Sequence, residues 1–233
     1  MRSLTSALAA LLAVLFVAFT AAPAAADWPG KPGRYVFEVT RNGDSIGTQT
    51  VTVKPDGDAV VTTTESVIAV KMLGIVVYRL HQTFTETYQG RKLISIRAES
   101  KDGDGLRIAD VKRDGDHWSG TYQKETRSFD CDCETSSMWQ MDGVRPGPMI
   151  EASLGRLRNV KVTDRGNETL DLPEGPVTTR HLSVTGDIER DVWYDPNGNL
   201  VSATQKGSDG SDIRQTLMSD PAGSRDAKPE ASE

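Results

Sequence analysis

Residues 188–217 read IERDVWYDPNGNLVSATQKGSDGSDIRQTL, and this stretch decides the fold. Apolar and polar residues alternate along it, as they do in strands that bury one face. Two turn sequences divide it, Asp195-Pro196-Asn197-Gly198 and Ser208-Asp209-Gly210-Ser211. Pro, Asn-Gly and Asp-Gly supply the backbone angles that tight turns need. The stretch therefore predicts three antiparallel strands joined as a meander.

Most of the remaining chain repeats this pattern. Segments rich in β-branched and aromatic residues alternate with Gly- and Asp-containing turns, at a spacing of roughly 8–12 residues that is typical of barrels and sandwiches. We predict an all-β fold, an antiparallel meander of about 10–12 strands curled into a barrel or half-barrel. Residues 27–219 are expected to form a single domain, and residues 220–233, which lack large apolar side chains, a disordered tail.

One region departs from the alternating pattern. The segments from Thr135 to Met141 and from Pro148 to Gly155 resemble short helical turns, because Pro148 suits an early helical position and Gly155 suits a C-terminal stop. We expect one or two short helices near residues 136–155. They would plug or cap one end of the sheet.

Residues 1–26 have the composition of a signal peptide. Arg2 supplies the positive charge, an apolar core runs from Leu8 to Phe19, and Ala24-Ala25-Ala26 is a small-residue cleavage site. The apolar run is shorter than the ~20 residues of a membrane span, although an uncleaved anchor helix is the alternative. We expect cleavage near Ala26, a periplasmic or secreted protein, and no transmembrane segment in the mature chain.

The charge balance and the motifs narrow the function classes. The chain carries a formal net charge of −6, which argues against nucleic acids and anionic membrane surfaces as partners. It has no HExxH motif, no Ser-His-Asp spacing and no glycine-rich phosphate loop. An enzyme is therefore the less favoured class.

The most apolar part of the mature chain is VIAVKMLGIVVY, residues 67–78, in which Lys71 is the only charge. It predicts either two buried strands that meet at Gly74 or the apolar rim of a ligand cavity. Trp139 has the same two interpretations, as a core residue or as a cavity wall. The candidate ligand is a lipid or another apolar small molecule, and the candidate binding residues are Val70, Met72, Leu73, Tyr78, Leu80, Phe84, Trp118, Met138 and Trp139.

Cys131 and Cys133 form the sharpest local motif. Side chains at i and i+2 of a strand point the same way, so the two sulfur atoms are predicted to lie close together. A structural disulfide, a metal site with His117, and a redox-active thiol are all compatible with this spacing, and we favour the disulfide. The acidic neighbours raise a thiol pKa, which disfavours the redox-active thiol. No other cofactor is predicted.

Several motifs carry a resemblance to a protein family. The sequences SSMWQ at residues 136–140, WYDPNG at residues 193–198 and DGSDI at residues 209–213 resemble those of an exported proteobacterial family defined by a domain of unknown function, and LGIVVYRLHQTFTETYQGRKL at residues 73–93 fits the same pattern. The chain departs from that family at Gln140, where Asn is usual, and in its cysteine pair. The resemblance implies a distant similarity to exported antiparallel β-scaffolds, some of which carry lipoproteins or bind lipids.

These observations predict an exported periplasmic β-scaffold that binds an apolar or amphipathic, lipid-like ligand. Two alternatives remain open. One is a metal- or redox-linked envelope protein centred on Cys131 and Cys133. The other is a structural or interaction protein of the envelope that uses an exposed sheet edge.

Overall fold

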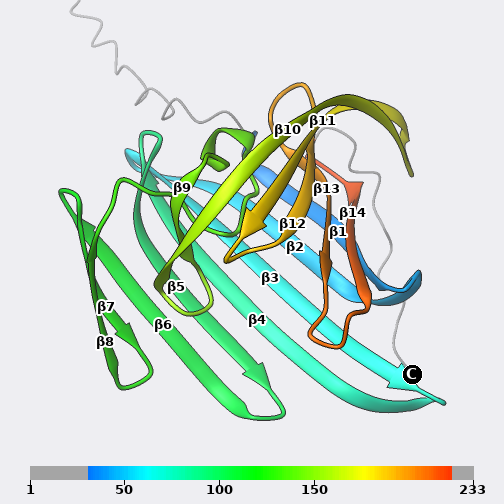
Figure 1. Cartoon of the computed structure of the whole chain (residues 1–233), viewed down its shortest axis with the longest axis horizontal. Coiled ribbons are helices and arrows are strands. Elements are labelled where there is room, and N and C mark those ends of the chain that lie inside the picture. Colours follow the sequence, from blue (N-terminus) through cyan, green and yellow to red (C-terminus); the bar gives the residue numbers. More distant parts are fainter. Residues whose placement is uncertain (1–30, 222–233) are drawn as a thin grey trace, which may run out of the picture.

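The computed structural model describes residues 31–221, so the expected signal peptide and nearly all of the expected C-terminal tail lie outside the described residues. The described part is a single sheet of fourteen strands (Figure 1). The strands are β1 (Gly33–Arg41), β2 (Asp44–Asp56), β3 (Ala59–Met72), β4 (Ile75–Gln89), β5 (Lys92–Asp102), β6 (Gly105–Asp114), β7 (His117–Tyr122), β8 (Glu125–Asp130), β9 (Gly147–Glu151), β10 (Arg156–Leu172), β11 (Gly175–Gly186), β12 (Arg190–Tyr194), β13 (Leu200–Lys206) and β14 (Asp212–Ser219).

The sheet is an antiparallel meander that is curled but not closed. Its order is β8-β7-β6-β5-β4-β3-β2-β1-β14-β13-β12-β11-β10-β9, so the first and last strands pair in its centre. The edges are β8 and β9, and β9 to β12 arch over the concave face of β1 to β5 in Figure 1. The predicted all-β meander is confirmed, with more strands than the expected 10–12.

The stretch at residues 188–217 folds as its alternation predicts. It contains β12, β13 and most of β14, which pair consecutively. At the first turn Gly198 has φ +79°, and a carboxylate oxygen of Asp195 accepts the backbone N–H groups of Asn197 and Asn199, each at 2.8 Å. The turn residues therefore set the local backbone in the way that the sequence indicates.

Of the one or two short helices expected near residues 136–155, the structure has one, and the helical interpretation of residues 148–155 is wrong. Among the described residues the only helical element is a 3-10 turn, η1 (Met141–Gly143), and Pro148 lies in β9. Met149 pairs with Arg158 and Ile150 with Leu157, while both apolar side chains enter the core. Pairing with β10 therefore overrides the local helical signals of Pro148 and Gly155.

Residues 131–146, here called the crossing segment, connect the two edge strands through the interior of the curl. The Ile150 N–H donates to Glu134 O and the Ser136 N–H to Ile150 O, each at 2.8 Å. Further along, the Leu200 N–H donates to the Trp139 carbonyl at 3.1 Å. The segment is therefore hydrogen-bonded to both β9 and β13.

Two apolar clusters flank the crossing segment. One joins β1 to β3 with β9 to β13 and includes Phe37, Trp139 and Tyr194. The other joins β4 to β7 with β9 and includes Trp118 and both cysteines. The Tyr35 and Trp139 rings pack with centroids 5.2 Å apart. The segment thus supplies side chains that the concave face of the sheet buries.

Tyr194→Phe should lower the free energy of unfolding by about 1–3 kcal/mol. The buried Tyr194 hydroxyl donates to the Met138 carbonyl at 2.6 Å, and the variant leaves that carbonyl without this partner. Urea unfolding measures the change. Tyr122→Phe is the control, with an expected change within about 0.5 kcal/mol, since the partly exposed hydroxyl of Tyr122 makes no such bond. Equal losses of stability in the two variants would show that the Tyr194–Met138 hydrogen bond does not contribute as expected.

Candidate functional site

A cavity of about 800 Å³ occupies the part of the concave face that the crossing segment leaves uncovered. Its walls come from β1 to β4, from β13 and β14 with the turn between them, and from the residues around the start of β12. Ser136, Ser137 and Trp139 of the crossing segment and Glu151 and Ser153 near the end of β9 complete the lining. The volume falls in the usual range for small-molecule sites, roughly 300–1,000 Å³. The cavity is therefore large enough for a lipid-sized ligand.

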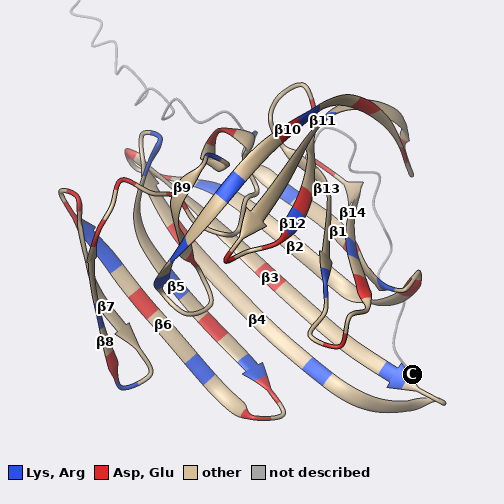
Figure 2. Ribbon diagram, viewed as in Figure 1, with Lys and Arg blue, Asp and Glu red and all other residues tan. Residues whose placement is uncertain are grey.

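One wall of the cavity is apolar and comes from the paired strands β3 and β4. Ile68 pairs with Leu80 and Val70 with Tyr78, so these four side chains lie on the concave face of the sheet. Phe84 continues this wall toward the crossing segment. Few charged residues interrupt β3 and β4, whereas β5 and β6 alternate acidic and basic residues (Figure 2).

Beyond the buried Val60, the inner face of β3 buries its polar residues more deeply than its apolar ones. The side chains of Thr62, Thr64 and Ser66 are buried, whereas Ile68 and Val70 are only partly buried. A strand that served only the protein core would place its apolar residues at the buried positions. The apolar part of β3 therefore faces the cavity and is not covered by the chain itself.

The apolar surface continues to the end of the β3–β4 hairpin. Met72 is 60% exposed, Ile75 is 69% exposed and Leu73, at the turn, is fully exposed. Exposed apolar residues that are contiguous in this way mark interaction sites. The apolar wall of the cavity is therefore continuous with an exposed apolar hairpin end.

The lining away from β3 and β4 mixes apolar and polar side chains and includes Arg190 of β12. Its guanidinium donates to the side-chain oxygen of Gln205 and, at 3.4 Å, to the carbonyl of Ser136. Burial lowers the pKa of Arg190 below its ordinary value. Arg41 also belongs to this part of the lining and is paired with Asp209. The cavity is therefore amphipathic, with a cation opposite an apolar surface.

Six of the nine predicted ligand-binding residues line this cavity, namely Val70, Met72, Tyr78, Leu80, Phe84 and Trp139. The other three lie elsewhere. Leu73 is at the exposed hairpin turn, Met138 is buried in the core and lines a smaller pocket, and Trp118 is buried in the second cluster, where its indole donates to Cys131 O. Arg190 was not among the predicted residues. It lies two residues from both Ile188 and Val192, so the alternation of the strand places its side chain on the same inner face.

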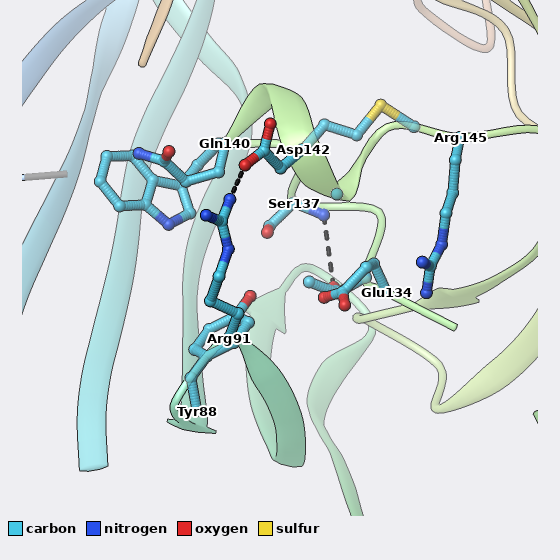
Figure 3. Close-up of a pocket in the computed structure, with 11 residues that line it drawn as sticks. Tyr88, Arg91, Glu134, Ser137, Gln140, Asp142 and Arg145 are labelled. Atoms are coloured by element: carbon cyan, nitrogen blue, oxygen red, sulfur yellow. Dashed lines mark hydrogen bonds and ion pairs between the residues drawn. The ribbon is translucent and has the colours of Figure 1, made fainter. Parts of the chain in front are cut away.

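A smaller pocket of about 180 Å³ lies on the other side of the crossing segment (Figure 3). Its charged side chains are Arg91, Glu134, Asp142 and Arg145, and Arg91 is paired with Asp142. Burial raises the pKa of Glu134 to about 7, Arg145 offsets part of this rise, and Glu86 adds to it. Glu134 therefore titrates near neutral pH.

Glu86 lies fully buried on β4 beneath this pocket. One of its carboxylate oxygens accepts hydrogen bonds from Thr62, Tyr88 and Ser137 at 3.1–3.2 Å. Burial nevertheless raises its pKa, because desolvation outweighs these bonds. Since Ser137 belongs to the crossing segment, Glu86 attaches that segment to the floor of the sheet.

The cysteines lie at the start of the crossing segment. Their sulfur atoms are at bonding distance and their Cα atoms are 5.3 Å apart, within the usual range for a disulfide. His117 points instead to Asp130, at 2.7 Å. Within residues 31–221 no group of three or more His, Cys, Asp or Glu side chains is placed to hold a metal ion. The geometry therefore gives the metal alternative no ligand cluster in the part of the chain that the structure describes.

Comparisons with known proteins agree with this architecture. The family model of a domain of unknown function, DUF6134, matches residues 37–218. The chain belongs to the DUF6134 family. This domain covers all fourteen strands except the ends of β1 and β14. No curated protein matches the chain.

The DUF6134 fold is similar to that of a crystal structure described as a beta-barrel-like protein of the domain of unknown function DUF1849 from Brucella abortus. The two are 13% identical, the match covers 80% of this chain and 95% of the other, and the TM-score is 0.58. At this identity the likeness shows the fold alone. The predicted resemblance to a family of unknown function with a distant β-scaffold relative is confirmed.

The stability of the protein should depend on pH through Glu134. The unfolded carboxyl ionises near pH 4.5 and the folded one near pH 7, so the folded state binds more protons between these values and loses stability as the pH rises. Between these limits the wild type should lose about 2 kcal/mol relative to Glu134→Gln. Urea unfolding across this range measures the difference. Glu174→Gln, which removes an exposed carboxyl, is the control and should show the pH dependence of the wild type. If the stability of Glu134→Gln changes with pH in the same way as that of the wild type, Glu134 is not the group responsible.

The disulfide stays a prediction with a direct test. Alkylation of the unfolded, non-reduced protein should add no mass, because neither Cys131 nor Cys133 has a free thiol. After reduction, both cysteines should be labelled. Labelling before reduction would show that the sulfur atoms are not bonded.

Proposed function

We propose that this protein is exported, loses residues 1–26, and binds an apolar or amphipathic, lipid-like ligand in the periplasm. The single observation that supports this best is the inverted inner face of β3, where Ile68 and Val70 line a cavity of about 800 Å³ while Thr62 and Thr64 are buried. A ligand chain lying on this wall would bury the apolar area that the protein leaves uncovered, at about 25 cal/mol per Å².

The architecture supports the same proposal. Curled antiparallel sheets hold small ligands against their concave face, as lipocalin-type barrels do. In this chain the crossing segment fills one part of the curl and leaves the other part open. Within the described residues no helix is long and apolar enough to cross a membrane.

The first test asks whether the protein carries a ligand. The full chain is produced with its N-terminal segment, purified from the periplasm without detergent, and examined by native mass spectrometry. We expect a bound lipid-like species, or stoichiometric binding of laurate or 1-dodecanol added afterwards. Recovery from the cytoplasm only, or the absence of both a co-purified lipid-like species and probe binding, would overturn the proposal.

The second test places the ligand in the cavity. Ile68→Asn should weaken the binding of 1-dodecanol by about tenfold, because it puts a polar amide on the apolar wall. Val67→Asn is the matched control, since Val67 directly precedes Ile68 in the same strand but is 51% exposed on the opposite face. Titration calorimetry measures both. Equal affinities of the two variants would place the probe outside this cavity.

A further inference from the structure

Arg190 is a cation on the concave face of the sheet without an acidic partner. Its hydrogen bonds go to the neutral Gln205 side chain and to the Ser136 carbonyl, and it forms no ion pair with any residue in the range 31–221. A partly buried cation without a counter-charge is costly, and proteins retain such groups where they bind something. Arg190 therefore needs a functional explanation.

The donor geometry of Arg190 leaves room for a ligand. A guanidinium has five N–H groups in a planar fork, and the three hydrogen bonds to Gln205 and Ser136 leave two of them unused. Two N–H groups on one guanidinium match the two oxygens of a carboxylate or phosphate. The Gln205 and Ser136 bonds hold the fork in place, so little side-chain entropy is lost on binding.

The carboxylates that line the same cavity are engaged elsewhere. Glu151 is paired with Arg156 and Arg158, and Asp209 with Arg41. Asp187 is exposed and accepts the backbone N–H of Asn159 at 2.8 Å. The positive charge of Arg190 is therefore not cancelled by an ion pair inside the cavity.

From this arrangement we infer that Arg190 binds the anionic head group, a carboxylate or a phosphate, of an amphiphile whose chain lies on the Ile68, Val70 and Leu80 wall. The inference rests on the proposed function and specifies further that the ligand carries a negative charge. It also gives the ligand an orientation, with its head at β12 and its tail toward the β3–β4 hairpin.

Four probes test the charge preference on the full mature chain. Laurate and dodecyl phosphate carry the same chain with different anionic heads, 1-dodecanol carries it without charge, and inorganic phosphate has no chain. By titration calorimetry, laurate, dodecyl phosphate or both should bind at least about tenfold more tightly than 1-dodecanol, and inorganic phosphate should not bind detectably. The stronger of the two anions identifies the head group.

Variants assign that preference to Arg190. Arg190→Gln should reduce the advantage of the anionic probe over 1-dodecanol to about twofold or less, and Arg190→Lys should retain part of it. Arg79→Gln is the matched control, because Arg79 is an exposed cation on the outer face of β4 without an ion-pair partner among the described residues. An arginine that only supports the structure would change the affinities of laurate and 1-dodecanol by the same factor.

The outcomes separate the inference from the proposed function. If 1-dodecanol and both anions bind equally to the wild type, the inference is overturned while the proposed function stands. If no chain-bearing probe binds, the proposed function fails. If Arg190→Gln does not fold, the wild-type comparison and Arg190→Lys still decide, because a preference for the anions that Arg190→Lys leaves fully unchanged would contradict the assignment.

Discussion

The structure depends on how the crossing segment is held inside the curled sheet. In an open sheet the two edge strands, here β8 and β9, do not pair with each other, so no strand pairing between the edges fixes the curvature. The crossing segment supplies this constraint, since its backbone bonds to Ile150 of β9 and Leu200 of β13 while Ser137 donates to Glu86 of β4. Strands far apart in the sheet order are thereby held at a fixed separation, and the space between them has a defined shape.

Two ionisable side chains on the inner face, Glu86 and Arg190, are accommodated in different ways. Glu86 accepts three hydrogen bonds from the protein, and burial favours its neutral form, so it can remain in the interior without a counter-ion. Arg190 keeps its positive charge, because a guanidinium group is not deprotonated in proteins, although burial lowers its pKa. The first residue thus completes the packing of the crossing segment, whereas the second leaves a positive charge facing an open cavity.

Local signals predicted most of the fold, and long-range pairing decided the rest. The Asp195-Pro196-Asn197-Gly198 turn carries its own backbone angles, so the sequence predicts it directly. Ile150 could not be assigned in this way, because its strand conformation depends on partners in β10 and in the crossing segment. Trp118 shows a further limit, since alternation places it on the inner face but does not reveal which of the two clusters receives it. Alternation also places Arg190 on the inner face, but only the fold shows that it forms no ion pair with an acid among residues 31–221.

The cavity itself follows from unequal strand lengths. β3 and β4 have 14 and 15 residues, whereas β12 and β13 have 5 and 7. At about 3.3 Å per residue, β3 and β4 are therefore much longer than β12 and β13. Strand ends that face solvent are normally polar on both faces, yet the inner face of β3 and β4 carries Ile68, Val70 and Leu80 here. Burial within the chain does not fully account for these residues, because all three stay only partly buried. An apolar surface that is built into the sheet and left uncovered by the fold is one that a ligand can cover.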